Sequence, residues 1–181
     1  MAKKKVPLLM LAPPALFVGF AVLFAFGMLR ENPDALPSAR AGQAAPALAL
    51  TPFNGQAPFT DATLREGGVK LVNYWASWCA PCRAEHRFLK QLQDEGMPIY
   101  GINYKDDADN AVAFLEELGD PFAGYGSDVA GRTALDWGLY GVPETYLIAA
   151  DGTVMLRFAG PITESILEST IRPAIAEAEA R

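Results

Sequence analysis

The sequence is poor in the residues that build structural metal sites and disulfide frameworks. It has two cysteines and one histidine among 181 residues. A bond between Cys79 and Cys82 closes a loop too short to stabilise the fold much. A zinc site needs four ligands, and besides the cysteines only His86 and carboxylates are available. We therefore expect neither a disulfide scaffold nor a bound metal.

Basic side chains are scarce after residue 30. Residues 31–181 carry 11 lysines and arginines against 21 aspartates and glutamates. An acidic surface repels the phosphates of nucleic acids, so we expect no nucleic-acid partner.

Hydrophobic residues are abundant in one place. Residues 6–29 contain no charged side chain, and three lysines precede them. As a helix this run would span about 36 Å, against a hydrocarbon core of about 30 Å. The lysines keep the N-terminus in the cytoplasm by the positive-inside rule. A cleaved signal peptide is the alternative, but its apolar stretch is usually about 7–15 residues and its cleavage site lies close behind.

This pattern predicts four parts of the chain. They are a cytoplasmic basic tail at 1–5, a transmembrane anchor at 6–29, a flexible linker at 30–45 and an exported domain at 46–181.

Periodicity in the exported part predicts an α/β fold. We expect strands at 47–51, 57–60, 70–75, 98–104, 144–149 and 153–159. We expect helices from Asp61, from Cys79 to Gly96, from Asp106 to Gly119, at 127–137 and at 163–180. Helices that alternate with buried strands indicate parallel pairing in the centre, and the last two strands form an antiparallel hairpin. The expected architecture is a mixed central sheet with helices on both faces.

Cys79-Ala80-Pro81-Cys82 carries the chemistry. A cysteine at a helix N-terminus has its thiolate stabilised by backbone N–H groups and the helix dipole, so its pKa falls. We expect Cys79 to be the attacking thiolate and Cys82 to resolve the mixed disulfide. Trp78 either supplies an apolar lip for a substrate peptide or packs at the surface.

A second motif is Gly141-Val142-Pro143-Glu144-Thr145. A cis bond before Pro143 would free the backbone of Val142 to pair with an extended substrate chain. Proline statistics alone favour the trans form, because only about 5–6% of X-Pro bonds are cis.

Three blocks together resemble one family. They are residues 72–82, residues 83–86 with 103–107, and residues 140–145. The first resembles the strand and active-site turn of thioredoxins, and the set resembles the membrane-tethered CcmG/DsbE proteins of cytochrome c maturation. The resemblance implies a thioredoxin fold with a cis Pro143, an N-terminal transmembrane helix in a bacterial inner membrane and a periplasmic domain.

The resemblance also implies function. Members of that family are weak reductants of apocytochrome c or of a haem-ligation thiol partner, and a membrane carrier of CcdA or DsbD type re-reduces them. Their cofactor is the redox-active disulfide, here Cys79–Cys82. The buried aspartate of thioredoxin appears here as Asn73, and Glu85 matches the family's proposed acidic substitute. The expected catalytic residues are thus Cys79, Cys82 and Glu85.

The expected substrate-binding residues are Trp78, Val142, Pro143 and Glu144. Glu85 could instead be an ordinary first-turn acid, and Glu144 is a second acidic candidate. The acidic residues from Asp106 to Asp109 either line the substrate groove or only start a helix.

Three other functions stay open. A general exported reductase of TlpA or ResA type has the same chemistry and another client. An oxidant differs only in potential and redox partner. A metal-delivery module on the same fold is disfavoured, because it usually separates its cysteines by three residues and adds a distant histidine.

Overall fold

The computed structural model describes residues 12–28 and 41–180. Residues 12–28 form helix α1 (Ala12–Met28), within the predicted anchor. In the described residues no helix is both long and apolar enough to cross a bilayer. The rest of the predicted anchor, residues 6–11 and 29, lies outside the described residues, as do the basic tail and most of the linker.

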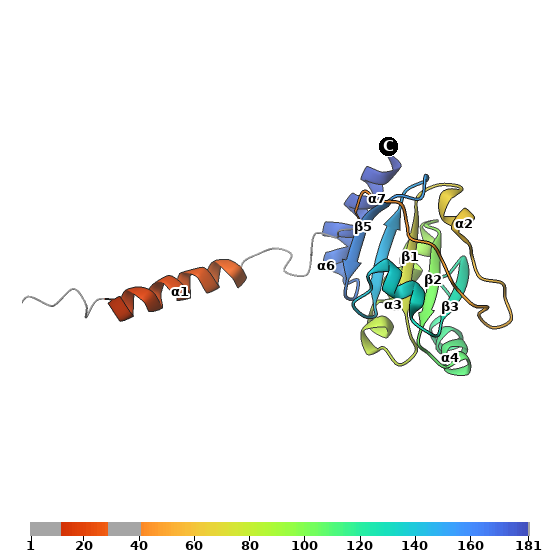
Figure 1. Ribbon diagram of the computed structural model, residues 1–181, viewed down its shortest axis with the longest axis horizontal. Coiled ribbons are helices and arrows are strands. Elements are labelled where there is room, and N and C mark those ends of the chain that lie inside the picture. The colour runs from red at the N-terminus through yellow and green to blue at the C-terminus, as the bar shows by residue number, and fades with distance from the viewer. Residues whose placement is uncertain (1–11, 29–40, 181) are drawn as a thin grey trace, which may run out of the picture. The chain divides into compact units, whose positions relative to one another are not determined.

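The remaining elements form one folded unit (Figure 1). Its helices are α2 (Asp61–Arg65), α3 (Ala80–Asp94), α4 (Ala108–Leu118), α5 (Arg132–Trp137), α6 (Glu164–Ile166) and α7 (Arg172–Glu179). Its strands are β1 (Lys70–Trp75), β2 (Ile99–Tyr104), β3 (Gly124–Asp128), β4 (Glu144–Ile148) and β5 (Val154–Ala159). The five strands lie in the order β3-β2-β1-β4-β5. β1, β2 and β3 are parallel, while β4 runs antiparallel to both β1 and β5. The predicted mixed sheet is confirmed.

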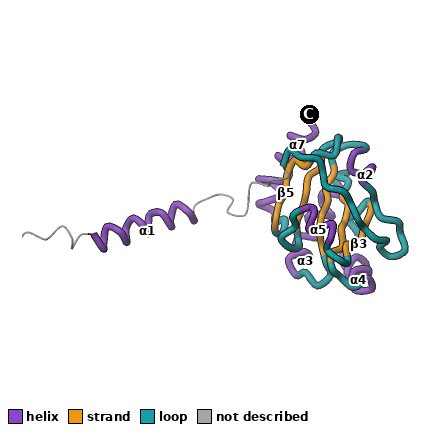
Figure 2. The backbone as a smooth tube through the Cα atoms, in the orientation of Figure 1, coloured by secondary structure: helices purple, strands orange, loops and turns teal. Residues whose placement is uncertain are grey.

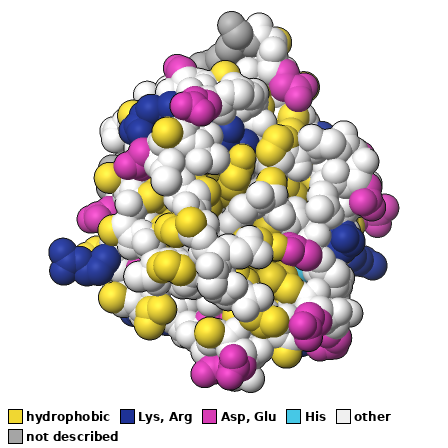
Figure 3. Space-filling model, turned by 90° about the vertical axis from the view of Figure 1, so that its right-hand side faces the viewer, with side chains coloured by type: hydrophobic (Ala, Val, Ile, Leu, Met, Phe, Trp, Pro, Cys, Tyr) yellow, Lys and Arg dark blue, Asp and Glu magenta, His cyan; other side chains and the backbone are white. Residues whose placement is uncertain are grey.

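Helices cover both faces of this sheet, and α5 crosses in front of the strands in Figure 2. Alternation along β1 divides the core, because successive side chains of a strand point to opposite faces. Leu71 and Trp75 pack with α3, α4 and the C-terminal helices, whereas Val72 and Tyr74 pack with α2 and α5. Asn73 lies between Leu71 and Trp75 and therefore faces α3. On the face drawn in Figure 3, acidic side chains are spread around a more hydrophobic centre.

The predicted helix at 127–137 is wrong in its first half. Strand β3 occupies 124–128, and the helix α5 begins only at Arg132. The strand is not visible in the sequence pattern because Gly124 and Gly126 have low strand propensity. Both lie in close contacts: a Cβ on Gly126 would lie 2.4 Å from Leu50 Cδ1, so Leu50 would have to shift, and one on Gly124 would lie 3.2 Å from the Tyr100 ring. Asp128, at the end of β3, accepts the N–H of Ala134 in α5 at 2.7 Å.

The two strands predicted at 47–51 and 57–60 are also absent. This segment makes only isolated bridges, between Thr51 and Ser127 and between Phe53 and Gln56. Its apolar side chains fill the edges of both cores instead, as Phe53 and Phe59 do. Earlier in the chain, the N–H groups of Gly42 and Ala45 donate to carbonyls of the β5 hairpin.

The C-terminal helix predicted at 163–180 is interrupted. A π-helical segment at Leu167–Ile171 separates α6 from α7. Pro173 follows it and has no N–H to donate to the preceding turn, which accounts for the irregularity.

Candidate functional site

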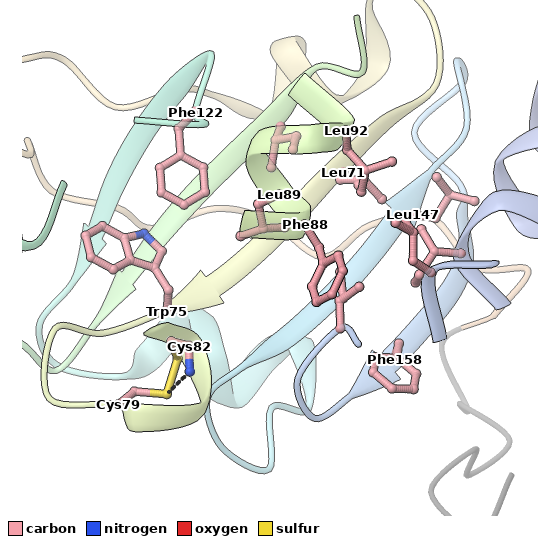
Figure 4. Packing of buried hydrophobic residues seen from close by; sticks show 14 of the residues in the cluster. Leu71, Trp75, Cys79, Cys82, Phe88, Leu89, Leu92, Phe122, Leu147 and Phe158 are labelled. Carbon is pink, nitrogen blue, oxygen red and sulfur yellow. Dashed lines mark hydrogen bonds between the residues drawn. A yellow bond between two sulfur atoms is a disulfide. The ribbon is translucent and has the colours of Figure 1, made fainter. Parts of the chain in front are cut away.

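The disulfide lies at the start of α3, just after the turn that follows β1. Cys79 is the N-cap of α3, Cys82 lies in its first turn, and their sulfurs are bonded. The N–H of Cys82 donates to Cys79 Sγ at 3.1 Å (Figure 4). Pro81 occupies a first-turn position, where a missing N–H costs nothing. A backbone donor thus faces the sulfur of Cys79, the arrangement that favours a thiolate there once the disulfide is reduced.

Burial does not distinguish the two cysteines. In the disulfide form Cys79 is 3% exposed and Cys82 is 2% exposed. Their positions do distinguish them, because only Cys79 lies at the helix N-terminus. The assignment of Cys79 as attacking residue and Cys82 as resolving residue stays a prediction.

The turn before Cys79 is held by Asp106. The Asp106 carboxylate accepts the N–H of Ser77 at 2.6 Å and its hydroxyl at 2.7 Å. It also accepts the amide of Asn103 at 2.9 Å, which ties the turn to the end of β2. The sequence pattern indicates only a groove lining or a helix start for Asp106. The cap of α4 is Asp107, whose carboxylate accepts the N–H groups of Asp109 and Asn110.

Trp78 lies on the outside of this turn. Its side chain is 59% exposed, and the indole Nε1–H donates to the carbonyl of Lys105 at 3.1 Å. An exposed indole fixed by a hydrogen bond presents a rigid apolar surface beside the disulfide.

An open groove of about 340 Å³ lies on another side of the turn. It is lined by Pro81, residues 140–144 and residues 159–161. The peptide bond between Val142 and Pro143 is cis, as the resemblance implied. Within residues 41–180 the N–H and C=O of Val142 have no hydrogen-bond partner, although Gly160 N–H binds the carbonyl of Pro143. The structure thus brings three of the predicted substrate-binding residues, Val142, Pro143 and Glu144, to the edge of one groove next to Pro81.

Glu85 is fully buried one turn beyond Cys82, on the same side of α3. Its Oε1 accepts the amide of Asn73 at 2.9 Å, and its Oε2 accepts the N–H of Ile162 at 2.8 Å. Burial raises the pKa of Glu85 to about 7, although both hydrogen bonds act in the opposite direction. A carboxyl with a pKa near neutrality is suited to exchange protons at physiological pH. An ordinary first-turn acid would be solvated, so the burial argues against that alternative.

Glu144 is just as buried but differently engaged. It lies on the sheet face of Tyr146, opposite to Asn73 and Glu85, because side chains alternate along β4. Arg157 contacts both carboxylate oxygens, at 2.8 and 3.1 Å. Glu144 also accepts the hydroxyl of Tyr146 at 3.0 Å and the N–H of Tyr140 at 2.7 Å. These bonds fix the loop before Pro143. A direct role of Glu144 in substrate binding stays a prediction.

His86 packs inside the protein. Its Nε2–H donates to the carbonyl of Gly119 at 2.7 Å, and its ring meets Phe114 edge-on. Burial lowers the pKa of His86, against the effect of the Gly119 carbonyl. Among the residues that the structure describes, no group of three or more histidine, cysteine or acidic side chains could hold a metal ion.

Similarities to known proteins agree with this geometry. The family model described as Redoxin matches residues 40–175. The chain is 46% identical to the thiol:disulfide interchange protein HelX of Rhodobacter capsulatus, over 93% of this chain and 96% of that protein. It is 38% identical to DsbE of Escherichia coli, over 94% of each chain.

Solved structures share the fold. The crystal structure of a DsbE-type protein from Chlorobium tepidum superposes with a TM-score of 0.65 at 28% identity, covering 76% of this chain and 99% of that one. A secreted disulfide oxidoreductase of Mycobacterium tuberculosis has a TM-score of 0.57 at 22% identity, covering 76% and 97%, and shows likeness of fold alone.

Proposed function

The chain belongs to the Redoxin family and to the DsbE-type thiol:disulfide interchange proteins within it, and on this basis we propose that it is a membrane-tethered reductant of cytochrome c biogenesis. Membership of this family makes the chain a thiol–disulfide oxidoreductase. We further propose that it acts as a reductant, that its client belongs to cytochrome c biogenesis and that it works outside the cytoplasm.

The observation that carries the proposal is the disulfide at the start of α3 beside a groove with free main-chain groups. Val142 offers an N–H and a C=O to an extended peptide, in the manner of strand addition. The groove places that peptide next to Pro81, within the Cys79–Cys82 turn. The exposed Trp78 extends the apolar surface around the disulfide.

The proposed reaction begins with the reduced protein. The Cys79 thiolate attacks one sulfur of a client disulfide, so an S–S bond forms to Cys79 and the client releases a thiolate. Cys82 then gives its proton to Glu85 and attacks the sulfur of Cys79. The bond to the client breaks, and the second client thiolate leaves. Two electrons have passed to the client, its two thiolates take up protons from solvent, and the Cys79–Cys82 disulfide remains.

Apocytochrome c, or a thiol protein of haem ligation, is the proposed client. Support comes from the three sequence blocks that resemble the CcmG/DsbE proteins. A carrier of CcdA or DsbD type is the proposed electron donor. The apolar run at 6–29 and the lysines before it support an inner-membrane anchor with a periplasmic domain.

The direct test of this proposal is trapping. Cys82→Ser leaves Cys79 without a resolving thiol, so a mixed disulfide with the client should accumulate and be identified by mass spectrometry. The control is the double variant Cys79→Ser, Cys82→Ser, which should trap nothing. Absence of any adduct in the single variant would count against a reductant acting through Cys79.

A second experiment separates a dedicated reductant from a general one of TlpA or ResA type. Deletion of the gene should abolish c-type cytochromes while other exported disulfide proteins keep their thiol state, and added thiol should rescue the loss. A broad change in exported disulfides would favour the general reductase.

A further inference from the structure

The side-chain amide of Asn73, in the middle of β1, is only partly hydrogen-bonded. It is fully buried, and its amide nitrogen donates twice, to Glu85 Oε1 at 2.9 Å and to Thr145 Oγ1 at 3.0 Å. Its amide oxygen has no partner among the described residues. An unpaired buried acceptor destabilises the folded state, so an amide held this way needs a reason beyond packing.

Both partners of the amide nitrogen can reverse their hydrogen-bonding roles. An ionised carboxylate only accepts, whereas a protonated carboxyl donates through its O–H. The hydroxyl of Thr145 both donates and accepts. When Glu85 takes up a proton at Oε1, two donors, an N–H and an O–H, point at one another in the present orientation of Asn73.

A half-turn of the Asn73 amide removes this conflict. The amide is planar, and its oxygen and nitrogen have nearly the same shape, so a rotation about the last side-chain bond exchanges them without changing the packing. The oxygen then accepts from the Glu85 O–H and from the Thr145 hydroxyl. The nitrogen takes the unpaired place that the oxygen has now, so each orientation leaves one amide atom unpaired.

We propose that Asn73 is a positioning residue whose amide turns with the protonation of Glu85, donating to the carboxylate and accepting from the acid. The inference rests on the proposed function, in which Glu85 receives the proton of Cys82 when the mixed disulfide is resolved. The turning amide gives Glu85 a hydrogen-bond partner before and after that transfer.

Asn73 is the neighbour of Glu85 that can both donate to the carboxylate and accept from the acid. From β1 the carboxyl meets Asn73, which lies beside Thr145 of β4, and from the segment before α6 it meets the N–H of Ile162. On α3 the neighbouring redox groups are Cys79 and Cys82. Within residues 41–180 no ion pair forms with Glu85. The Ile162 N–H is fixed in the backbone and can only donate.

The test on the unaltered chain is nuclear magnetic resonance of the Asn73 side-chain amide. The two N–H resonances of Asn73 should move between two positions as the pH rises from 5 to 9, with the same midpoint as the Glu85 carboxyl carbon. In Glu85→Gln they should stay in place. Asn73 resonances that do not move while Glu85 titrates would overturn the proposal.

A second readout uses reactivity of the reduced protein. The rate of Cys79 alkylation should show an inflection from Glu85 in its pH profile. Asn73→Leu removes the partner of both the carboxylate and the acid. Because the hydrogen bond to the charged form is the stronger of the two, the inflection should still move upward, while Thr145→Val should move it far less. Equal shifts in the two variants would contradict a specific role for Asn73. If Asn73→Leu does not fold, the resonance experiment still decides.

These outcomes are independent of the client. Failure of the Cys82→Ser trap would remove the proposed function, and the resonance titration would still report whether Asn73 follows Glu85. Conversely, a fixed Asn73 amide would leave the reductase proposal intact.

Discussion

Two buried glutamates, Glu85 and Glu144, lie on opposite faces of the central sheet near the same disulfide. Each is at most 1% exposed. Glu144 is paired with Arg157 in a bidentate ion pair and receives further hydrogen bonds from the loop before Pro143. Among the residues that the structure describes, Glu85 receives only the amide of Asn73 and the N–H of Ile162.

The difference shows that burial alone does not make a carboxyl reactive. A buried charge with a cationic partner and satisfied oxygens serves as a structural anchor. A buried carboxyl with neutral partners has a raised pKa and can exist in both protonation states near neutral pH. We therefore expect Glu144 to hold the loop before Pro143 and Glu85 to exchange protons.

Removing Arg157 should have the largest effect on stability, because Glu144 would then be a buried carboxyl without a cationic partner, as Glu85 is. Arg157→Met leaves the Glu144 charge buried and unpaired, which we expect to lower the free energy of unfolding by about 3–5 kcal/mol. Chemical denaturation at pH 7 measures it. The double variant Arg157→Met, Glu144→Gln should recover part of the loss, and a loss as large in the double variant would contradict the ion-pair account.

Glu85→Gln should change the pH dependence of the free energy of unfolding. In the folded chain the pKa of Glu85 is about 7 against 4.5 ordinarily. The folded protein thus keeps a proton that the unfolded chain has released, and stability falls as the pH rises from 4.5 to 7 and stays low above 7. The glutamine cannot ionise, so this fall, up to about 3 kcal/mol, should vanish. Unfolding curves at pH 5 and 8 test it, and an unchanged pH dependence in the variant would refute the assignment.

Asp106 is a third acid for the comparison; it is half-buried and holds the turn before Cys79. The variant to test is Asp106→Ala. Loss of its bonds to Ser77 and Asn103 should cost about 2 kcal/mol and loosen the turn before Cys79. A looser turn would no longer hold the Cys79 sulfur against the N–H of Cys82, which favours its thiolate. Cys79 should therefore be alkylated more slowly at pH 7 in the reduced protein. Asp107→Ala is the matched control, since it removes only the cap of α4 and should leave the alkylation rate unchanged.

Tyr146→Phe should have the smallest effect. It removes the hydroxyl, whose single hydrogen is shared between Glu144 and the carbonyl of Trp137, while the ion pair with Arg157 stays. We expect a loss of about 1 kcal/mol, with no change in pH dependence. A loss comparable to that of Arg157→Met would mean that the hydroxyl, rather than the guanidinium, stabilises Glu144.

Much of the fold and the site follows from local sequence signals. Dense apolar strands such as β1 and β2 and the amphipathic α3 are visible in periodicity, and the cysteine pair locates the helix start. β3 was missed because Gly124 and Gly126 have low strand propensity, and only contacts with Tyr100 and Leu50 explain them. Such contacts join residues far apart in the chain, which local patterns do not report.

The site shows the same limit. Spacing places Glu85 one turn after Cys82, but its burial depends on Asn73 and Ile162, which come from other parts of the chain. Nothing local separates Asp106, which clamps Ser77, from Asp107, which caps α4. The cis bond at Pro143 was available from the family resemblance and not from proline statistics.

The central claim is that Glu85 is a neutral-pH proton acceptor, and its titration tests this most directly. Carbon-13 resonance of the Glu85 carboxyl, assigned by comparison with Glu85→Gln, should show a midpoint near pH 7 in the disulfide form. A midpoint near the ordinary value of 4.5 would contradict the account.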